Sequence, residues 1–180
     1  MILLKKGKIM EEINIAYYKK YGLELIIGTF KGKLCLLDHI YRKQRNTIDN
    51  RIQKGLNAKF VEYEDETIKK VKKQLDEYFL MERKDFDIPL VFVGSEFQKS
   101  VWDALLKIPY GETRSYKQQA KIVGDEKAVR AVANANGANA ISIIVPCHRI
   151  IGSDGKLTGY AGGLNMKKKL LELENNLFTS

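Results

Sequence analysis

The 180-residue chain is 44% hydrophobic and 29% charged, which excludes an intrinsically disordered protein and suits one ordinary domain or two small domains that share an interface. No apolar run approaches the roughly 20 residues that span a bilayer, and the apolar start at residues 1–4 is too short for a signal peptide, so we expect a cytoplasmic protein. The net charge of +9 is compatible with a polyanionic partner such as nucleic acid, and equally with a generally basic composition.

The first half of the sequence predicts a mixed α/β region. Short β-rich runs at residues 13–18, 23–29 and 33–38 are separated by Gly22 and Gly32. Residues 41–60 are polar and basic and predict no defined element. Residues 64–80 predict a helix, because apolar side chains recur on one helical face, namely Ile68, Val71, Leu75, Tyr78 and Phe79. A proline at position 89 precedes a last short strand at 90–93, so we expect a domain boundary near residues 85–92.

The second half predicts capped helices that could form a helix-turn-helix. Residues 95–98 and 115–118 have the capping-box form, in which a serine and a glutamine satisfy each other's backbone N–H groups. The first of these helices ends at 109–111 and the second at Gly124, and Asp125 is expected to cap a third helix through residue 135. Two short helices joined by a glycine-containing turn are typical of a helix-turn-helix, although other capped pairs fit as well.

The remaining residues predict a strand, a turn, a loop and a helix. Residues 141–145 predict a buried strand that leads into Pro-Cys-His-Arg at 146–149. Residues 153–156 predict a hairpin-type turn and residues 159–163 a loop. A last helix at about 165–175 is expected to bury Leu170, Leu171 and either Leu173 or Leu177.

Cys147 and His148 form the candidate chemical centre. A free thiol has a pKa of about 8.5, so it is a weak nucleophile near neutral pH unless a base removes its proton. Adjacent side chains on an extended chain point in opposite directions, so His148 would need a turn or a water relay to reach the sulfur. Glu172 or Glu174 could orient the histidine. From these residues alone a packing role for the cysteine stays open, and core filling is the expected role of Cys35.

The surroundings of Cys147 resemble the O6-alkylguanine-DNA alkyltransferases. Residues 144–150, Ile-Val-Pro-Cys-His-Arg-Ile, are similar to the active-site signature of that family. Further segments are similar to the start of its helix-turn-helix, its recognition helix, its substrate loop and its closing helix, in that order: 97–102 with 108–112 and 115–116, then 128–132, 159–164 and 170–174. The resemblance covers residues 95–174 almost without gaps, which is far more specific than a Cys-His pair.

The resemblance implies an α+β fold of two domains. Residues 1–88 would form an N-terminal ribonuclease-H-like α/β domain. Residues 89–180 would form a mostly helical domain with a winged helix-turn-helix, which carries both DNA binding and the active site. The three strand-like runs and one helix of the first half fit this expectation only loosely.

The implied activity is DNA repair by a methylated-DNA–protein-cysteine methyltransferase that acts once. An alkyl group would move irreversibly and stoichiometrically from O6 of guanine, and from O4 of thymine, in duplex DNA to Cys147, after the damaged base has been flipped out of the helix. The transfer would inactivate the protein. The implied partner is double-stranded DNA carrying O6-alkylguanine, bound by a monomer with no cofactor and no membrane.

The resemblance also assigns catalytic roles by position. Cys147 would accept the alkyl group, His148 would take its proton through a water molecule, and Glu174 would orient His148. Asn139 would stabilise the turn that holds the cysteine. Tyr116 would contact the base and a phosphate and would donate a proton to the departing guanine.

Binding roles follow in the same way. Arg130 would enter the duplex and fill the gap left by the flipped base. The other implied DNA contacts are Tyr116, Ala131 and Ser115. The implied substrate contacts are Tyr160, Ala161, Gly162, Ile150 and Lys167.

Several positions depart from the family pattern or limit the chemistry. Ala140 stands where relatives often have proline, and Asn136-Gly137 replaces bulkier or basic residues, which we expect to weaken groove contacts. Cys35 and His39 are too few for a closed zinc site, so we expect no metal. Two rival interpretations are a cysteine hydrolase and a DNA-binding regulator without chemistry. The presence of Cys147 favours chemistry, because non-catalytic members of the family lack this cysteine.

Overall fold

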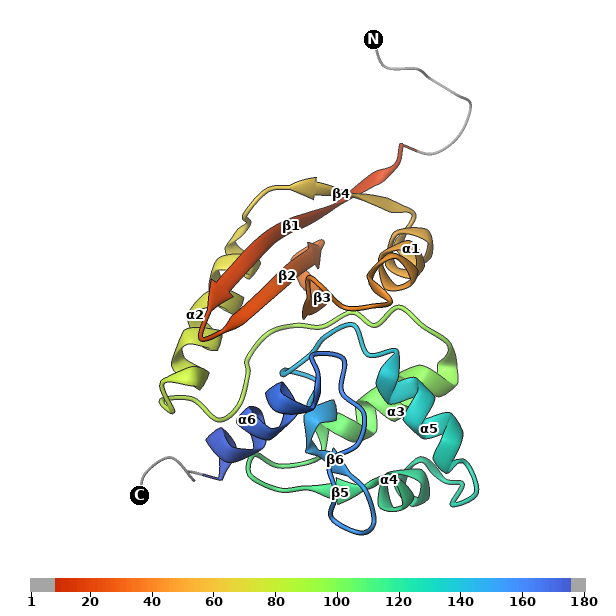
Figure 1. Ribbon diagram of the computed structural model, residues 1–180. Coiled ribbons are helices and arrows are strands. Elements are labelled where there is room, and N and C mark those ends of the chain that lie inside the picture. Colours follow the sequence, from red (N-terminus) through yellow and green to blue (C-terminus); the bar gives the residue numbers. More distant parts are fainter. Residues whose placement is uncertain (1–8, 176–180) are drawn as a thin grey trace.

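A four-stranded mixed sheet forms the first half of the molecule in the computed structural model, which describes residues 9–175 (Figure 1). The strand order is β3-β2-β1-β4, with antiparallel pairing except between β1 and β4, which are parallel; the strands are β1 (Glu11–Lys20), β2 (Leu23–Phe30), β3 (Lys33–His39) and β4 (Ala58–Glu62). Two-residue loops at 21–22 and 31–32 join the first three strands, with positive φ at all four residues, as in type I′ turns. The three predicted strands are confirmed.

Both faces of the sheet are covered. Helix α2 (Glu66–Phe79) begins at Asp65, whose side chain accepts a hydrogen bond from the Ile68 backbone N–H, and it packs on one face. The predicted helix is confirmed, although Phe79 is only partly buried. Helix α1 (Arg45–Leu56) packs on the other face and leads into β4. Sequence analysis missed α1 and β4. The apolar pattern of α1 is weak, because this helix buries only two isoleucines, at positions 48 and 52.

Four helices and a short parallel strand pair form the second half. They are α3 (Glu96–Leu106), α4 (Tyr116–Val123), α5 (Val129–Gly137) and α6 (Leu164–Glu174), with β5 (Arg114–Ser115) beside β6 (Ile150–Ile151). Both predicted capping boxes are present. Asp125 does not cap α5, because its carboxylate accepts the Lys127 N–H within a turn that ends before the helix begins. Residues 153–156 form a turn, but no hairpin results, because β6 pairs in parallel with β5.

The strands predicted at residues 90–93 and 141–145 do not form. Each of these segments makes only a single bridge to the open edge of β3. Residues 89–91 make a single bridge, with the Leu34 N–H on the Pro89 carbonyl and the Val91 N–H on the Leu34 carbonyl. Residues 140–142 make another, in which Leu37 donates to the Ala140 carbonyl and accepts from the Ser142 N–H. The chain then turns, with a positive φ of 71° at residue 143. The second half of the molecule is thereby joined to the sheet edge.

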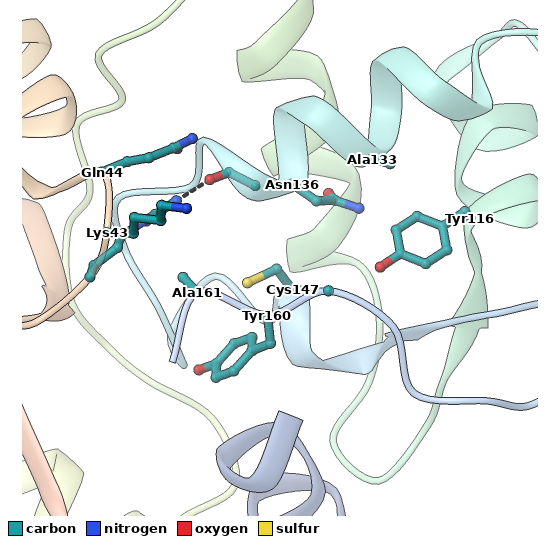
Figure 2. Close-up of a pocket in the computed structure, with 11 residues that line it drawn as sticks. Lys43, Gln44, Tyr116, Ala133, Asn136, Cys147, Tyr160 and Ala161 are labelled. Atoms are coloured by element: carbon teal, nitrogen blue, oxygen red, sulfur yellow. Dashed lines mark hydrogen bonds between the residues drawn. The ribbon is translucent and has the colours of Figure 1, made fainter. Parts of the chain in front are cut away.

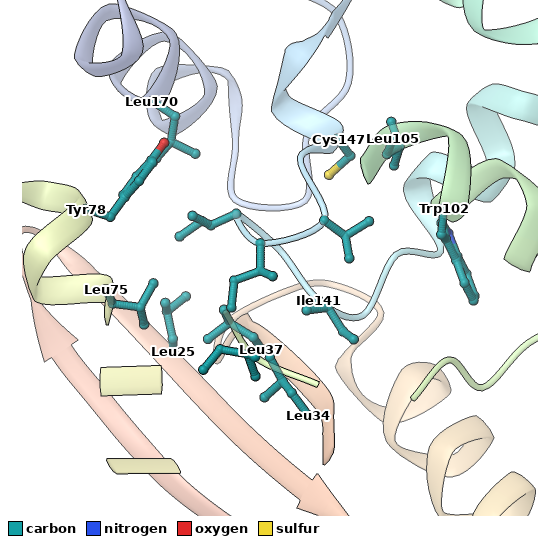
Figure 3. Packing of buried hydrophobic residues seen from close by; sticks show 14 of the residues in the cluster. Leu25, Leu34, Leu37, Leu75, Tyr78, Trp102, Leu105, Ile141, Cys147 and Leu170 are labelled. Atoms are coloured by element: carbon teal, nitrogen blue, oxygen red, sulfur yellow. The ribbon is translucent and has the colours of Figure 1, made fainter. Parts of the chain in front are cut away.

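One continuous hydrophobic core spans both halves. Figure 3 shows Leu37 from the first half beside Ile141 from the second, and Leu25, Leu75 and Cys147 belong to the same buried cluster. In α6, Leu170 and Leu173 are buried and residue 171 only partly so, while Leu177 lies outside the described residues. Among residues 9–175, no helix has the length and apolar character needed to cross a membrane.

Candidate active site

A tight turn holds Cys147 at the start of a short 3-10 helix (Cys147–Arg149). The side chain of Asn139 bridges the two ends of this turn: its Nδ2 donates to the Val145 carbonyl at 2.9 Å, and its Oδ1 accepts the Ile141 N–H at 2.9 Å. Because Asn139 is 3% exposed, these bonds are protected from water. Asn139 therefore fixes the backbone of the turn that bears the cysteine, which is where the sequence analysis expected it to act.

His148 and Glu174 form a fully buried pair next to the cysteine. His148 Nε2 lies 2.7 Å from Glu174 Oε1, and both side chains have no exposed surface. Among the described residues, His148 Nδ1 is buried without a hydrogen-bond partner. The alternative orienting residue, Glu172, is partly exposed and lies 3.7 Å from Lys168. The geometry thus selects Glu174 from the two carboxylates that the sequence left open.

Glu174 also accepts hydrogen bonds from Arg149 and Tyr78, which sequence analysis did not identify. Arg149 Nε lies 2.9 Å from Oε2 and its Nη2 2.9 Å from Oε1, while the Tyr78 hydroxyl lies 2.7 Å from Oε1. Burial by itself raises the pKa of Glu174, but the hydrogen bonds of His148 and Arg149 and the positive charge of Arg149 outweigh it and lower the pKa to about 2. Glu174 is therefore a carboxylate at neutral pH.

The protonation states follow from this carboxylate. Burial lowers the pKa of His148, and this effect exceeds the opposing influence of Glu174, so the ring is neutral. Because ionised Glu174 can only accept, Nε2 of His148 carries the hydrogen and Nδ1 presents a lone pair. Burial raises the pKa of the Cys147 thiol, despite the hydrogen bond of Asn139 and the positive charge of Arg42. The resting thiol thus keeps its proton, and the histidine that follows it in the chain is neutral.

A cavity of about 300 Å³ opens over Cys147 (Figure 2). Both halves of the molecule line it, with residues Arg42, Lys43, Gln44, Tyr116, Ala133, Asn136, Gly137, Cys147, Gly159, Tyr160 and Ala161. Its volume is at the small end of the range for ligand pockets, about 300–1,000 Å³. Sequence analysis missed the contribution of residues 42–44, because that segment predicted no element.

Hydrogen bonds from Lys167 and Tyr116 fix the backbone of the loop that carries Tyr160. Lys167 is buried, and its Nζ donates to the Thr158 carbonyl at 2.9 Å and to the Gly159 carbonyl at 3.2 Å. The Tyr116 hydroxyl donates to the same Thr158 carbonyl at 2.8 Å. A Cβ at Gly162 would collide with the ring of His39, so a glycine at this position lets the loop pass the ring.

Other substrate contacts expected from the sequence lie outside the cavity lining. Gly162 faces His39 behind the loop, and Lys167 lies beneath the loop. The side chain of Ile150 is fully buried in the core, so only its backbone could meet a ligand. Tyr160 and Ala161 line the cavity directly.

Comparisons with known proteins identify the family of this chain. The family model described as "6-O-methylguanine DNA methyltransferase, DNA binding domain" matches residues 96–176. The methylated-DNA–protein-cysteine methyltransferase of Methanosarcina acetivorans is 56% identical over 112 residues, which cover 62% of this chain and 72% of that protein. This chain belongs to the methylated-DNA–protein-cysteine methyltransferase family. The Mycobacterium tuberculosis member is 58% identical over 103 residues, 57% of this chain and 62% of its own length.

Solved structures extend the likeness of this methyltransferase-family chain to its first half. The Mycobacterium tuberculosis O6-methylguanine methyltransferase has a TM-score of 0.76 and 38% identity over 91% of this chain and 93% of that one. The structure of the same organism's protein in complex with DNA has a TM-score of 0.78 and 39% identity, over 92% and 93%. The α+β architecture of mixed sheet and helices is therefore that of the family.

Arg42 joins the first half of this methyltransferase-family chain to the turn that bears the cysteine. Its guanidinium donates to Asp38 Oδ2 and to the Asn139 carbonyl, both at 2.8 Å, and also bonds the Gly137 carbonyl. Asp38 is fully buried and is also 2.8 Å from Arg45. The only sequence signal for this cluster was the basic character of residues 41–60.

A shallower groove adjoins the cavity along α4 and α5. It shares Tyr116, Ala133 and Gly159 with the cavity and is otherwise lined by Lys117, Lys127, Val129, Arg130, Ser153 and Thr158. Arg130 and Ala131 are exposed on α5, and Ser115 caps α4 through its hydroxyl. The groove is therefore basic and continuous with the mouth of the cysteine cavity.

Asn136 joins α5 to α4, the two helices that border this groove. Its side-chain amide is buried and exchanges two hydrogen bonds with Gln119, at 2.9 Å and 2.6 Å. This pair fastens α5 to α4. Asn136 thus holds the two helices together, and the expected weakening of groove contacts at Asn136-Gly137 stays a prediction.

Proposed function

We propose that this protein repairs DNA by moving an alkyl group from O6 of guanine onto Sγ of Cys147. The observation that carries the proposal is a cysteine that lines a cavity and is followed in the chain by a buried histidine, which is hydrogen-bonded to a buried carboxylate. DNA is the proposed partner, since the Mycobacterium tuberculosis protein was solved in complex with DNA. Double-stranded DNA, a monomeric protein and a cytoplasmic setting complete the proposal.

The proposed chemistry is a nucleophilic displacement at the alkyl carbon. The thiol proton passes, through a water molecule, to Nδ1 of His148, and Glu174 stabilises the imidazolium that forms. The thiolate attacks the alkyl carbon, so that the S–C bond forms as the C–O6 bond breaks. The electron pair of the broken bond stays on guanine, which takes a proton from the Tyr116 hydroxyl. The Cys147 thioether carries no group that restores the thiol, so the protein acts once and is inactivated. O4 of alkylated thymine would react in the same way.

Base flipping would bring the alkyl group to the cysteine. A stacked guanine hides its O6 substituent, so the nucleotide must leave the helix. We propose that α4 and α5 act as a winged helix-turn-helix within a DNA-binding and active-site domain of residues 89–180, with Ser115, Tyr116 and Ala131 near the backbone. Arg130 would fill the vacated stack, while Tyr160, Ala161, Gly162, Ile150 and Lys167 would shape the guanine site. Residues 1–88 would be the ribonuclease-H-like domain.

Intact-protein mass spectrometry tests the proposal directly. After incubation with duplex DNA containing O6-methylguanine, the protein should gain the mass of one methyl group, and peptide mapping should place it on Cys147. Cys147→Ala should gain nothing. Cys35 is an internal control, because burial raises its pKa to about 12. Methylation of Cys35, or more than one product per protein molecule, would contradict the proposal, and turnover would favour a hydrolase.

Arg130→Ala should slow repair of duplex DNA while leaving the reaction with free O6-benzylguanine nearly unchanged. Flipping costs a few kcal/mol, so loss of its compensation corresponds to a slowing of roughly ten- to a hundredfold on duplex DNA alone. Single-turnover rates on the two substrates measure this. Lys117→Ala, which removes another cation from the same groove, should weaken duplex binding without a separate effect on the transfer step. Equal losses on both substrates in Arg130→Ala would point to a damaged pocket instead.

A further inference from the structure

A hydroxyl from the first half of the chain reaches the catalytic carboxylate. Tyr78, near the end of α2, is fully buried and donates to Glu174 Oε1 at 2.7 Å. This oxygen is the one that lies 2.7 Å from His148 Nε2. Figure 3 shows the Tyr78 ring extending from α2 toward α6, beside Leu170. A chain of hydrogen bonds therefore runs from Tyr78 on α2, in the first half, through Glu174 to His148 in the second half.

The Tyr78 ring has little freedom to move. Three aromatic rings surround it, with centroid distances of 5.2 Å to Phe79, 5.4 Å to Phe86 and 6.1 Å to Tyr110. Burial and the charge of Glu174 raise the pKa of Tyr78 well above its usual value, so the hydroxyl stays protonated and can donate. Tyr78 is thus a fixed donor on an oxygen that must keep its place beside the histidine.

We propose that Tyr78 is a positioning residue of the transfer reaction, which fixes Glu174 Oε1 against His148 and shares the charge of that oxygen. Arg149, on the 3-10 helix, donates from Nε to Oε2 of Glu174 and from Nη2 to Oε1. Tyr78 adds a further donor to Oε1 from α2, and this donor opposes rotation of the carboxylate away from the ring. This inference rests on the proposed function for its consequence, but its geometry is independent of any substrate.

Two effects follow from removal of the hydroxyl alone. The carboxylate becomes freer to move, so proton transfer from Cys147 to His148 is less often in the productive geometry. Glu174 also becomes a stronger acceptor for His148, which raises the pKa of the histidine. The charged or titratable groups that face this pair, apart from Tyr78, are Arg149, Tyr110 and Lys167, and Tyr78→Phe alters none of these residues.

The test compares Tyr78→Phe with Tyr18→Phe. Tyr18 is a matched control, because its hydroxyl also donates to a carboxylate at 2.7 Å, that of Asp76 on α2, away from Glu174. Tyr78→Phe should slow transfer from O6-methylguanine DNA about tenfold, as expected for a lost hydrogen bond to a charged group. The acidic limb of its pH–rate profile should move to higher pH. Tyr18→Phe should retain the parental rate and profile.

Two further measurements keep the outcome decisive. 3-Fluorotyrosine at position 78 keeps the ring and hydroxyl but donates more strongly, so it should move the acidic limb to lower pH. In a Glu174→Gln background, Tyr78→Phe should have no further effect, because its partner oxygen is no longer charged. A Tyr78→Phe profile that coincides with that of Tyr18→Phe, or an undiminished effect in Glu174→Gln, would overturn the proposal.

Alkylation of Cys147 by iodoacetamide separates this inference from the proposed function. The pH–rate profile of that reaction also depends on proton removal by His148, but it involves no DNA. If the parent protein takes no alkyl group from DNA, the proposed function fails. The iodoacetamide profile then tests the Tyr78 proposal by itself. Its acidic limb should move to higher pH in Tyr78→Phe and should not move in Tyr18→Phe.

Discussion

Glu174→Gln is expected to slow alkyl transfer by a factor on the order of 10²–10⁴, the range typical of general acid–base catalysis. Glutamine can still accept a hydrogen bond from His148 Nε2, but it carries no charge to stabilise the imidazolium formed when Cys147 loses its proton. Single-turnover rates on methylated duplex DNA and on free O6-benzylguanine should fall together, because the defect lies in the chemistry. Duplex affinity should stay nearly parental, since the side chain of Glu174 has no exposed surface.

Glu172→Gln is the matched control for this experiment. It lies on the same helix, is partly exposed and pairs only with Lys168, at 3.7 Å. Its transfer rate should equal that of the parent. A parental rate in Glu174→Gln, with a loss in Glu172→Gln, would reverse the assignment of the orienting carboxylate. Thermal unfolding of both variants identifies any part of the loss that comes from a damaged fold.

Arg149→Met is expected to lower the free energy of unfolding by about 3–5 kcal/mol at pH 7, because it leaves a buried carboxylate without its main counter-charge. Arg149 is 7% exposed and also donates to the Ile108 carbonyl at 2.6 Å. Urea unfolding measures the difference. Arg114→Met serves as control: its pair with Glu112 is partly exposed, so a loss of no more than about 1 kcal/mol is expected.

The same pair makes stability depend on pH. The pKa of Glu174 is about 2 in the folded protein against 4.5 as its ordinary value, so its stabilisation is present above about pH 4.5 and is lost as pH falls toward 2. Without Arg149 the folded pKa of Glu174 rises, and less stability is lost on acidification. The gap between parent and Arg149→Met should therefore narrow below pH 4.5. A gap that stays constant across this window would show that the loss comes from packing.

Local patterns in the sequence were sufficient for the elements that depend on neighbouring residues. The capping boxes at Ser95 and Ser115 and the amphipathic face of α2 are present in the structure. Gly22 and Gly32 were expected to separate the β-rich runs, and in the structure both have positive φ within the two loops that join the strands. The segment around Cys147 indicated the family, since the resemblance runs through the whole second half.

Elements that depend on distant partners were missed or wrongly assigned. Residues 141–145 are as apolar as a buried strand, but the edge of β3 offers them one bridge before the chain turns to present Cys147. Helix α1 has a narrow apolar stripe, because the sheet face that it covers requires little more than Ile48 and Ile52. In both cases the tertiary packing decided the conformation, and periodicity carried no signal of it.

The sequence by itself pointed to the residues that we propose to carry the chemistry: a cysteine, a histidine, and a carboxylate on the last helix. Only the tertiary structure decided between Glu172 and Glu174, because two residues on one helix differ in the direction of their side chains and not in their composition. It also brought Tyr78 and Arg42 to the site, from positions 69 and 105 residues before Cys147 in the chain. A buried carboxylate needs several donors at once, and in this molecule they come from segments that only the packed fold brings together.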